Sequence, residues 1–200
     1  MGNKKMFLSL ISWAAFTILA DHGGTGFVPV AAAIAGLIAL AITIFNTRGS
    51  KLKLIDATGV VTFAAMTAIA FVGDDAVRRH IVDYGRGGCA LVLGLVMLAS
   101  LAFTPFTEQY AREATPRQYW TSPIFHAVNR KLTAVWAAAI IVMSGGHFLS
   151  GYLQAAGELH RRTNLALNWV LPVVLVLFAL KQTSRITSSD DAPAAPTVTA

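Results

Sequence analysis

Six long apolar runs, separated by short polar stretches, limit what this chain can fold into more than any other feature of its sequence. The runs cover residues 6–20, 27–45, 57–72, 87–104, 132–153 and 165–180. They are continuous rather than alternating, which indicates α-helices and not the strands of a membrane β-barrel. At about 1.5 Å per residue, the second, fourth and fifth runs can cross a hydrocarbon core about 30 Å thick, and the others need flanking residues to do so. The sequence therefore predicts an all-α fold, a polytopic transmembrane helix bundle of about six spans.

The distribution of charge agrees with a membrane protein and argues against other classes. Hydrophobic residues make up 55% of the chain and charged residues 13%, whereas charged residues approach a quarter of a soluble protein. The net charge of +6 does not indicate nucleic-acid binding, because the basic residues border the apolar runs and suit lipid headgroups instead. The single cysteine, Cys89, excludes an internal disulfide and a multi-cysteine metal site. We therefore expect the lipid bilayer as a partner, and no nucleic acid or metal.

The basic residues also predict the topology. If all six runs span and the N-terminus lies inside, eleven of the sixteen lysines and arginines fall on the inner side. If the first run does not span, nine fall outside and seven inside, which contradicts the positive-inside bias. A basic start followed by a short apolar run also occurs in signal peptides, but the charge pattern favours a retained first helix. Both termini are therefore expected in the cytoplasm.

The longest polar and aromatic interruption, residues 105–131, lies between the fourth and fifth runs. Thr104 suits an N-cap and Pro105 the first position of a helix. Glu108 and Arg112 follow at i,i+4 spacing, so we predict a short amphipathic helix at the inner interface. Aromatic rings suited to the headgroup level are those of Phe106, Tyr110, Tyr119 and Trp120. The segment is interpreted either as a membrane anchor or as a docking surface for a partner protein. The candidate interaction residues are Glu108, Tyr110, Arg112, Arg117 and Trp120.

Small residues recur at helical spacing within the runs, as in the pairs Ala32 and Gly36 or Ala90 and Gly94. Such pairs allow helices to approach closely in lipid, so a compact bundle is expected. The glycine-rich stretch 84–89, YGRGGC, lacks the lysine and the preceding strand of a phosphate-binding loop. It is interpreted as a turn that leads into the fourth run.

Two further boundaries follow from local signals. Ser122 and Pro123 repeat the combination of a cap and a proline, which predicts a helix that continues into the fifth run. Residues 184–200 are rich in Ser, Thr, Pro and Ala and have no apolar face, so we predict a disordered tail. Residues 1–183 are then a single transmembrane domain.

Polar residues inside the runs are the candidates for function. His147 lies within the fifth run, where its imidazole needs a hydrogen-bond partner or a watery cavity. Asn168 in the sixth run should face protein rather than lipid, and a kink at Pro172 would open a small cavity beside it. His22 is the one further histidine that a haem could use together with His147. No nucleophile with a positioned base is visible, so no catalytic residue is predicted.

The order of these features, closed by the stretch SPIFHAVNRKLTAVWAAAI, resembles the intracellular septation protein A family of small bacterial inner-membrane proteins. The similarity extends over residues 6–180 and rests on the layout and on the pattern of Asn129, Leu132 and Trp136. The resemblance implies a location in the bacterial inner (plasma) membrane and an association with the cell envelope and the division machinery. It implies no catalytic residue.

The leading hypothesis from the sequence is therefore a non-enzymatic inner-membrane protein that supports envelope or division functions through contacts with other membrane proteins. It needs no cofactor, and self-association is left open. The first alternative is a small membrane transporter or channel that uses His147, Asn168 and the helix break at Pro172. The second is a haem-binding redox subunit that uses His147 and His22.

Overall fold

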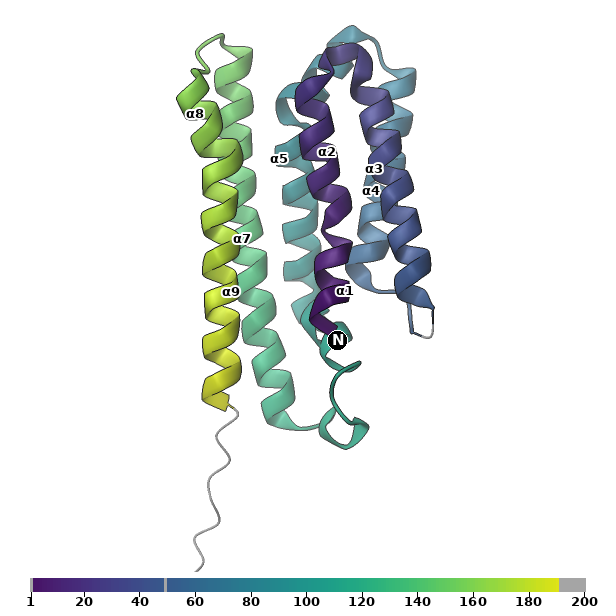
Figure 1. The fold of residues 1–200 in the computed structure, drawn as a ribbon, viewed down its shortest axis with the longest axis vertical. Helices are drawn as coiled ribbons and strands as arrows, with labels where there is room; N and C mark the ends of the chain where they lie inside the picture. Colours follow the sequence, from purple (N-terminus) through teal and green to yellow (C-terminus); the bar gives the residue numbers. More distant parts are fainter. Residues whose placement is uncertain (1, 49, 191–200) are drawn as a thin grey trace, which may run out of the picture.

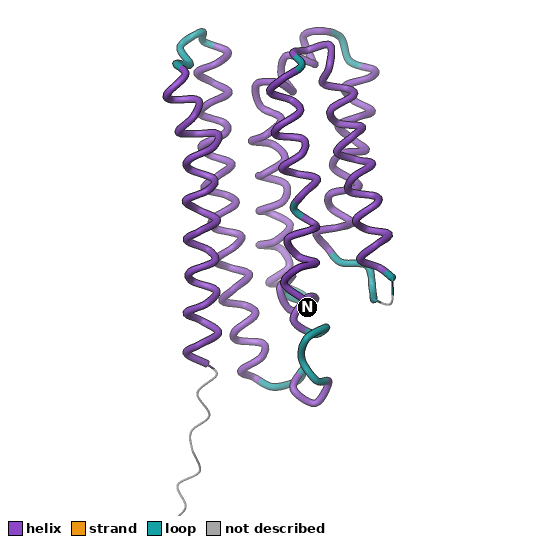
Figure 2. Tube along the Cα trace, viewed as in Figure 1, coloured by secondary structure: helices purple, strands orange, loops and turns teal. Residues whose placement is uncertain are grey.

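The structure is a computed structural model that describes residues 2–48 and 50–190, apart from the side chains of residues 2–4, 21–22 and 189–190. All regular elements in this part of the chain are helical, and the long helices run side by side as one elongated bundle (Figures 1 and 2), which confirms the all-α prediction. The elements are α1 (Gly2–Ser9), α2 (Ile11–His22), α3 (Gly24–Thr47), α4 (Leu54–Val72), α5 (Asp75–Ala99), η1 (Ser100–Ala102), α6 (Phe106–Ala111), η2 (Arg117–Tyr119), α7 (Pro123–Ala155), α8 (Arg161–Leu165), η3 (Ala166–Val170) and α9 (Leu171–Asp190).

The described chain passes along the bundle six times (Figure 1). α1 and α2 form the first pass, α3, α4, α5 and α7 form the next four, and α8, η3 and α9 form the last. The start of α1 and the end of α9 therefore lie at the same end of the bundle, here called the terminal end. The connections from α2 to α3, from α4 to α5 and from α7 to α8 lie at the opposite end, here called the far end.

The helices have the length and surface of a membrane protein. Among the described residues, five helices are long and apolar enough to cross a membrane: Gly24–Thr47, Leu54–Val72, Asp75–Ala102, Pro123–Ala155 and Arg161–Ser188. The first pass is apolar only over Lys5–Ala20 and is shorter. Large apolar side chains are exposed on the outside of the bundle, for example Leu37 at 67% and Val61 at 68%. In water such a surface is unfavourable, whereas in lipid it is expected.

Among the described elements, α5 and α7 share the most extensive contact, and they correct one prediction. The glycine-rich stretch was expected to be a turn, but α5 runs through it without interruption. A Cβ atom on Gly87 would lie 2.9 Å from Cγ of Phe148, and one on Gly94 would lie 2.7 Å from Cγ1 of Ile141. The glycines therefore leave room for α7 rather than bend the chain, as small residues do between membrane helices.

The compact packing expected from the small residues of the second run is confirmed. Ala32, Ala35 and Ala39 lie along the buried face of α3 and are almost fully covered. Opposite them, the ring of Phe63 from α4 lies 5.1 Å from that of Trp13 from α2, measured between ring centroids. The three helices α2, α3 and α4 thus form one side of the bundle around aromatic side chains.

α6 follows α5 and precedes α7 in the chain, where a short helix was predicted, but its aromatic side chains are placed differently from the prediction. Phe106 and Tyr110 were expected to meet lipid headgroups, whereas their side chains are 0% and 2% exposed. The hydroxyl of Tyr110 lies 3.2 Å from Oγ of Ser9 on α1. α6 therefore covers the end of the bundle, and its rings pack inside the protein.

The boundaries of the last two passes follow local chemistry. Oγ of Ser122 accepts a hydrogen bond from the backbone N–H of Phe125 at 3.1 Å, and Pro123 begins α7, as predicted. At the other boundary, α9 continues to Asp190, beyond the predicted domain end at residue 183. Within this extension the hydroxyl of Thr187 donates to the backbone carbonyl oxygen of Thr183 one turn earlier, at 3.0 Å. Residues 191–200 of the predicted tail lie outside the described residues.

Candidate functional site

A cleft of about 390 Å³ lies between α2 and the last pass, and its walls are almost entirely apolar. α2 and α9 form its two sides, while α5 and α7 also line it. The lining residues that carry the argument below are Leu10, Trp13, Arg86, His147, Asn168 and Leu177. A molecule in this cleft would therefore be in contact mainly with apolar side chains of these four helices.

One end of the cleft is polar, because His147 and Asn168 meet there. Nδ1 of His147 lies 2.8 Å from Oδ1 of Asn168, and each residue is only 6% exposed. Nδ2 of Asn168 donates to Oγ of Ser150 at 2.7 Å and to Oδ1 of Asn164 at 2.6 Å. The two candidate residues found in the sequence are therefore direct partners, in the way that buried polar groups in membranes require.

This hydrogen bond fixes the state of the imidazole. Since the side-chain amide of Asn168 donates in two other directions, its oxygen faces His147 and accepts a hydrogen bond from Nδ1–H. A neutral imidazole then carries its proton on Nδ1 and a lone pair on Nε2. Nε2 is the ring nitrogen that a molecule in the cleft can reach.

Asn168 is positioned by an irregular turn. Residues Ala166–Val170 form a π-helical segment, η3, immediately before α9. Pro172 has no N–H group and cannot donate to the carbonyl of Asn168 four residues earlier, so the regular α-helical ladder is interrupted there. The break that the sequence predicted at Pro172 therefore takes the form of a π segment, a kind of turn often found at functional sites.

Arg86 is the functional candidate that the sequence interpretation missed. The stretch 84–89 that contains it was interpreted as a turn, but Arg86 lies within α5, lines the cleft and is only 9% exposed. It is close enough to His147 for the two groups to interact electrostatically. Arg86 follows the start of α5 by eleven residues and His147 precedes the end of α7 by eight, which is roughly 12 to 17 Å from the far end. The signal in the sequence was an arginine between glycines, because glycine is more frequent in membrane helices than in the helices of soluble proteins.

The haem hypothesis requires His22 in addition to His147. His22 is the last residue of α2, and its side chain lies outside the described part of the structure. Within the described residues, no group of three or more His, Cys, Asp and Glu side chains could hold a metal ion. Joint ligation of a haem by His147 and His22 therefore stays a prediction, and an absorption spectrum of the purified protein without a Soret band would eliminate it.

The predicted interaction residues fall into two groups. Glu108 and Tyr110 are 1% and 2% exposed and have partners within the protein. Glu108 accepts from Nδ1 of His126 at 3.0 Å and forms an ion pair with Arg112. Such buried residues cannot contact a partner protein directly.

Arg112, Arg117 and Trp120 form the second group, at the surface of the terminal end. The guanidinium carbon atoms of Arg112 and Arg117 lie 5.3 and 5.7 Å from the centre of the Trp120 ring. Arg117 is exposed, and the other two residues are half-buried. Only this part of the predicted interaction loop is accessible from outside.

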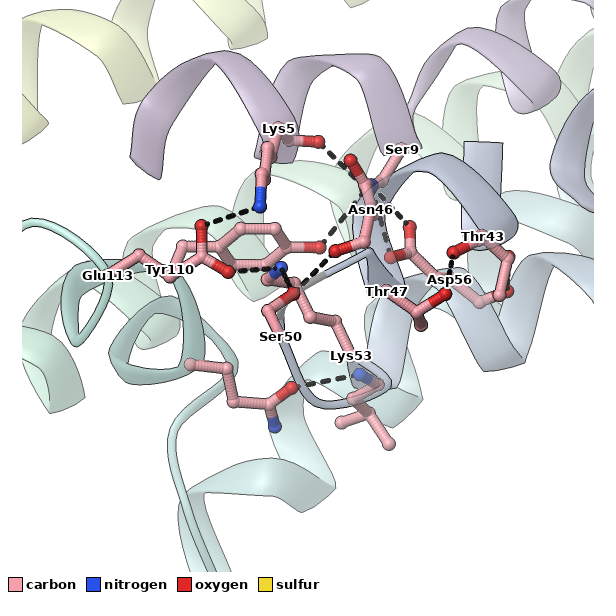
Figure 3. Close-up of polar contacts among 12 residues, drawn as sticks. Lys5, Ser9, Thr43, Asn46, Thr47, Ser50, Lys53, Asp56, Tyr110 and Glu113 are labelled. Atoms are coloured by element: carbon pink, nitrogen blue, oxygen red, sulfur yellow. Dashed lines mark hydrogen bonds and ion pairs between the residues drawn. The ribbon is translucent and has the colours of Figure 1, made fainter. Parts of the chain in front are cut away.

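A buried polar network joins α1, α3, α4 and α6 at the terminal end (Figure 3). Nδ2 of Asn46 donates to both carboxylate oxygens of Asp56, at 3.2 and 3.1 Å, and to Oγ of Ser9 at 3.1 Å. Asp56 occupies the first turn of α4. The network extends through the Ser9 hydroxyl to Tyr110, whose pKa is raised chiefly because the phenol is buried.

An ion-pair cluster lies beside this network. Glu113 binds Nζ of Lys53 at 2.6 Å and Nζ of Lys5 at 3.2 Å (Figure 3). Partial burial alone would raise the pKa of Glu113, but the hydrogen bonds and charges of the two lysines outweigh it, and the pKa is lowered. Lys53 is 2% exposed, so its charge depends on Glu113 for compensation. The cluster connects α1 with the start of α4 and with the segment that follows α6.

Comparison of the chain with protein families, with curated proteins and with solved structures finds no match. The resemblance to the intracellular septation protein A family is therefore carried by the residues quoted for it alone.

Proposed function

We propose that the protein is a membrane-embedded binding protein of the transporter class, which admits a small amphipathic molecule to the cleft between α2 and α9. The cleft of about 390 Å³, closed at one end by the His147–Asn168 pair, is the observation that supports this proposal. Binding sites for small molecules are mostly apolar concavities with a few placed polar groups. A protein that acted only through its outer surface would need no such cavity.

The proposal is tested by closing the cleft. Ala14 is an exposed residue of α2 that lines the cleft, so Ala14→Trp should occupy it without disturbing the core. Ala65→Trp is the matched control, because Ala65 is equally exposed on α4 and does not line the cleft. Native mass spectrometry of protein released from nanodiscs would count bound dodecanol, dodecanoic acid, dodecylamine and dodecyl phosphate. We expect at least one of them to bind to the wild type and the control but not to Ala14→Trp. If none is retained, the proposal is wrong.

Transport is tested separately from binding. Proteoliposomes are loaded with an NBD-labelled lysophospholipid, and dithionite reduces only the label in the outer leaflet. We expect the protein to accelerate its passage between leaflets and His147→Ala to abolish the acceleration while the helical circular dichroism spectrum is unchanged. Normal flux through that variant would contradict a role for His147 in transport.

We also propose that the protein resides in the bacterial plasma membrane with both termini in the cytoplasm. Two observations support this topology: eleven of the sixteen lysines and arginines belong to segments nearer the terminal end, and the chain makes an even number of passes. A reporter that works only in the cytoplasm should be active when it is fused after Ala200, and a reporter that works only in the periplasm should be inactive there. Activity of the periplasmic reporter would overturn the assignment.

A second candidate function is contact with other envelope or division proteins. The resemblance and the accessible surface of Arg117 and Trp120 favour it. A photo-crosslinking residue at position 117 should capture a protein partner, or a second copy of this chain, whereas the same residue at position 65 should capture lipid. If position 117 also yields only lipid, this candidate loses its support.

A further inference from the structure

We propose that the cleft binds a neutral amphiphile with a hydroxyl head group, which donates a hydrogen bond to Nε2 of His147, and with a hydrocarbon tail. This inference rests on the proposed function and specifies the chemical class of the ligand. Three features of the cleft lead to it: an imidazole acceptor of fixed tautomer, a wall whose other polar groups are already engaged, and an apolar section that leads away from the imidazole.

The first feature is the imidazole of His147. Its Nδ1–H donates to Oδ1 of Asn168 at 2.8 Å, so a neutral ring presents a lone pair at Nε2. Within the described part of the chain Nε2 has no hydrogen-bond partner, although the side chain is buried and lines the cleft. A buried acceptor without a donor is unfavourable. A ligand that brings an O–H group to Nε2 therefore gains a hydrogen bond, whereas a ligand that brings only acceptor atoms does not.

The second feature is the engagement of the other polar groups around the cleft. Oγ1 of Thr17 donates to the backbone carbonyl of Trp13 at 3.0 Å, and Arg86 already interacts with another group of the protein. The indole N–H of Trp13 lies on the side of Gly59 in α4, a helix that does not line the cleft. A charged head group would therefore lose its hydration among apolar side chains without meeting an unpaired counter-charge from the described residues. The wall favours a neutral head group over a carboxylate, a phosphate or an ammonium group.

The third feature is the direction of the apolar section. Arg86, His147 and Asn168 are the lining residues nearest to the far end on their helices, and the other lining residues of these helices lead towards the terminal end (Figure 1). From Asn168 to Leu177 the cleft follows the last pass for nine residues, which is about 14 Å along a helix. A hydrocarbon tail can lie along this section while its hydroxyl group reaches Nε2, as in other apolar sites with one placed polar group.

The experiment compares dodecyl compounds that separate the charge of the head group from its ability to donate a hydrogen bond. Dodecanol is neutral and donates, whereas dodecyl methyl ether is neutral and only accepts. Dodecylamine, dodecanoic acid and dodecyl phosphate are charged at pH 8. Each compound is added at the same concentration to the protein in nanodiscs, and native mass spectrometry counts the bound molecules. We expect dodecanol to bind about fivefold more tightly than the ether, as one hydrogen bond predicts, and more tightly than each charged compound.

Two further measurements test whether the preference arises at Nε2. His147→Leu removes the acceptor, so this variant should bind dodecanol and the ether equally, and its binding of the ether shows that it is folded. His80→Leu is the matched control, because His80 is an exposed histidine of α5 that does not line the cleft. In nitrogen NMR of the labelled wild type, dodecanol should shift the signal of Nε2 of His147, whereas the ether should not. The loss of this signal in His147→Leu identifies it.

The outcomes separate this inference from the proposed function. If the wild type binds dodecanol and the ether equally, the inference is overturned while binding to the cleft stands. Stronger binding of any charged compound than of dodecanol also overturns it. An unchanged preference for dodecanol in His147→Leu overturns the role of Nε2; if that variant binds neither compound, an Nε2 signal of the wild type that dodecanol leaves unshifted does the same. If no compound binds to the wild type, both proposals fail.

Discussion

Replacing Gly151 with alanine should destabilise the protein by forcing α5 and α7 apart. A Cβ atom at this position would overlap the backbone carbonyl oxygen of Asp83 and would lie 2.9 Å from its carbonyl carbon. A backbone atom within a long helix cannot rotate away as a side chain can, so the two helices must separate. This contact belongs to the most extensive helix–helix interface among the described residues.

The magnitude follows from two opposing effects. Exchange of glycine for alanine within a helix stabilises it by about 0.5 to 1 kcal/mol through the entropy of the unfolded chain. Overpacking typically costs about 1 to 3 kcal/mol, and contact with backbone belongs at the upper end. We therefore expect Gly151→Ala to lower the free energy of unfolding by about 2 kcal/mol. Gly145 and Gly88 are matched controls in α7 and α5, because nothing lies within 4 Å of a Cβ atom at either position.

The assay is unfolding in mixed micelles at increasing mole fractions of sodium dodecyl sulphate, followed by circular dichroism. Gly145→Ala and Gly88→Ala should unfold at or slightly above the mole fraction required for the wild type, while Gly151→Ala should unfold clearly below it. If Gly151→Ala is as stable as Gly145→Ala, the close contact between α5 and α7 does not exist as described.

Three further predictions concern single residues. The pKa of Glu113 is lowered in the folded protein. Its ion pairs therefore stabilise the folded state at pH values above the unfolded pKa of about 4.3. This contribution is lost as the pH falls through the folded pKa. Glu113→Gln should therefore flatten the acid limb of the stability curve measured by thermal unfolding, and an unchanged limb would contradict the pairing with Lys53. Ser122→Ala should lower the free energy of unfolding by about 1 kcal/mol, since it removes the N-cap of α7. Amide hydrogen exchange in the first turn of α7 should then be faster, and exchange at the wild-type rate would show that the cap is dispensable. Asn168→Leu should leave Nδ1–H of His147 without its acceptor, which nitrogen NMR of labelled histidine would detect as a changed tautomer ratio.

The sequence predicted those parts of the fold that depend on neighbouring residues. The start of α7 was found because a serine cap followed by proline is a local signal. The fourth run was predicted to start at residue 87, twelve residues after α5 begins at Asp75, because the glycines between Tyr84 and Cys89 were interpreted as a turn. Contact with α7 explains the glycines, and that contact is not visible in any local pattern.

Two members of the candidate site were predicted from the sequence, but their assembly with Arg86 was not. His147 and Asn168 were each expected to need a partner, and the turn between α7 and α8 makes them partners of one another. Arg86 joins them from a helix about sixty residues away in the chain, so no spacing rule could have placed it there. The cleft itself combines four helices, and its volume depends on how they pack.

α9 is supported by protein on one side only. It packs chiefly on α7, and only 11% of the residues in the most apolar stretch of Arg161–Ser188 are buried. The tilt of a helix that is mostly solvated by lipid responds to the thickness of the surrounding bilayer. A thicker or thinner host membrane should therefore change the angle between α9 and α2. The width of the entrance between these helices then depends on the surrounding lipids as well as on the protein.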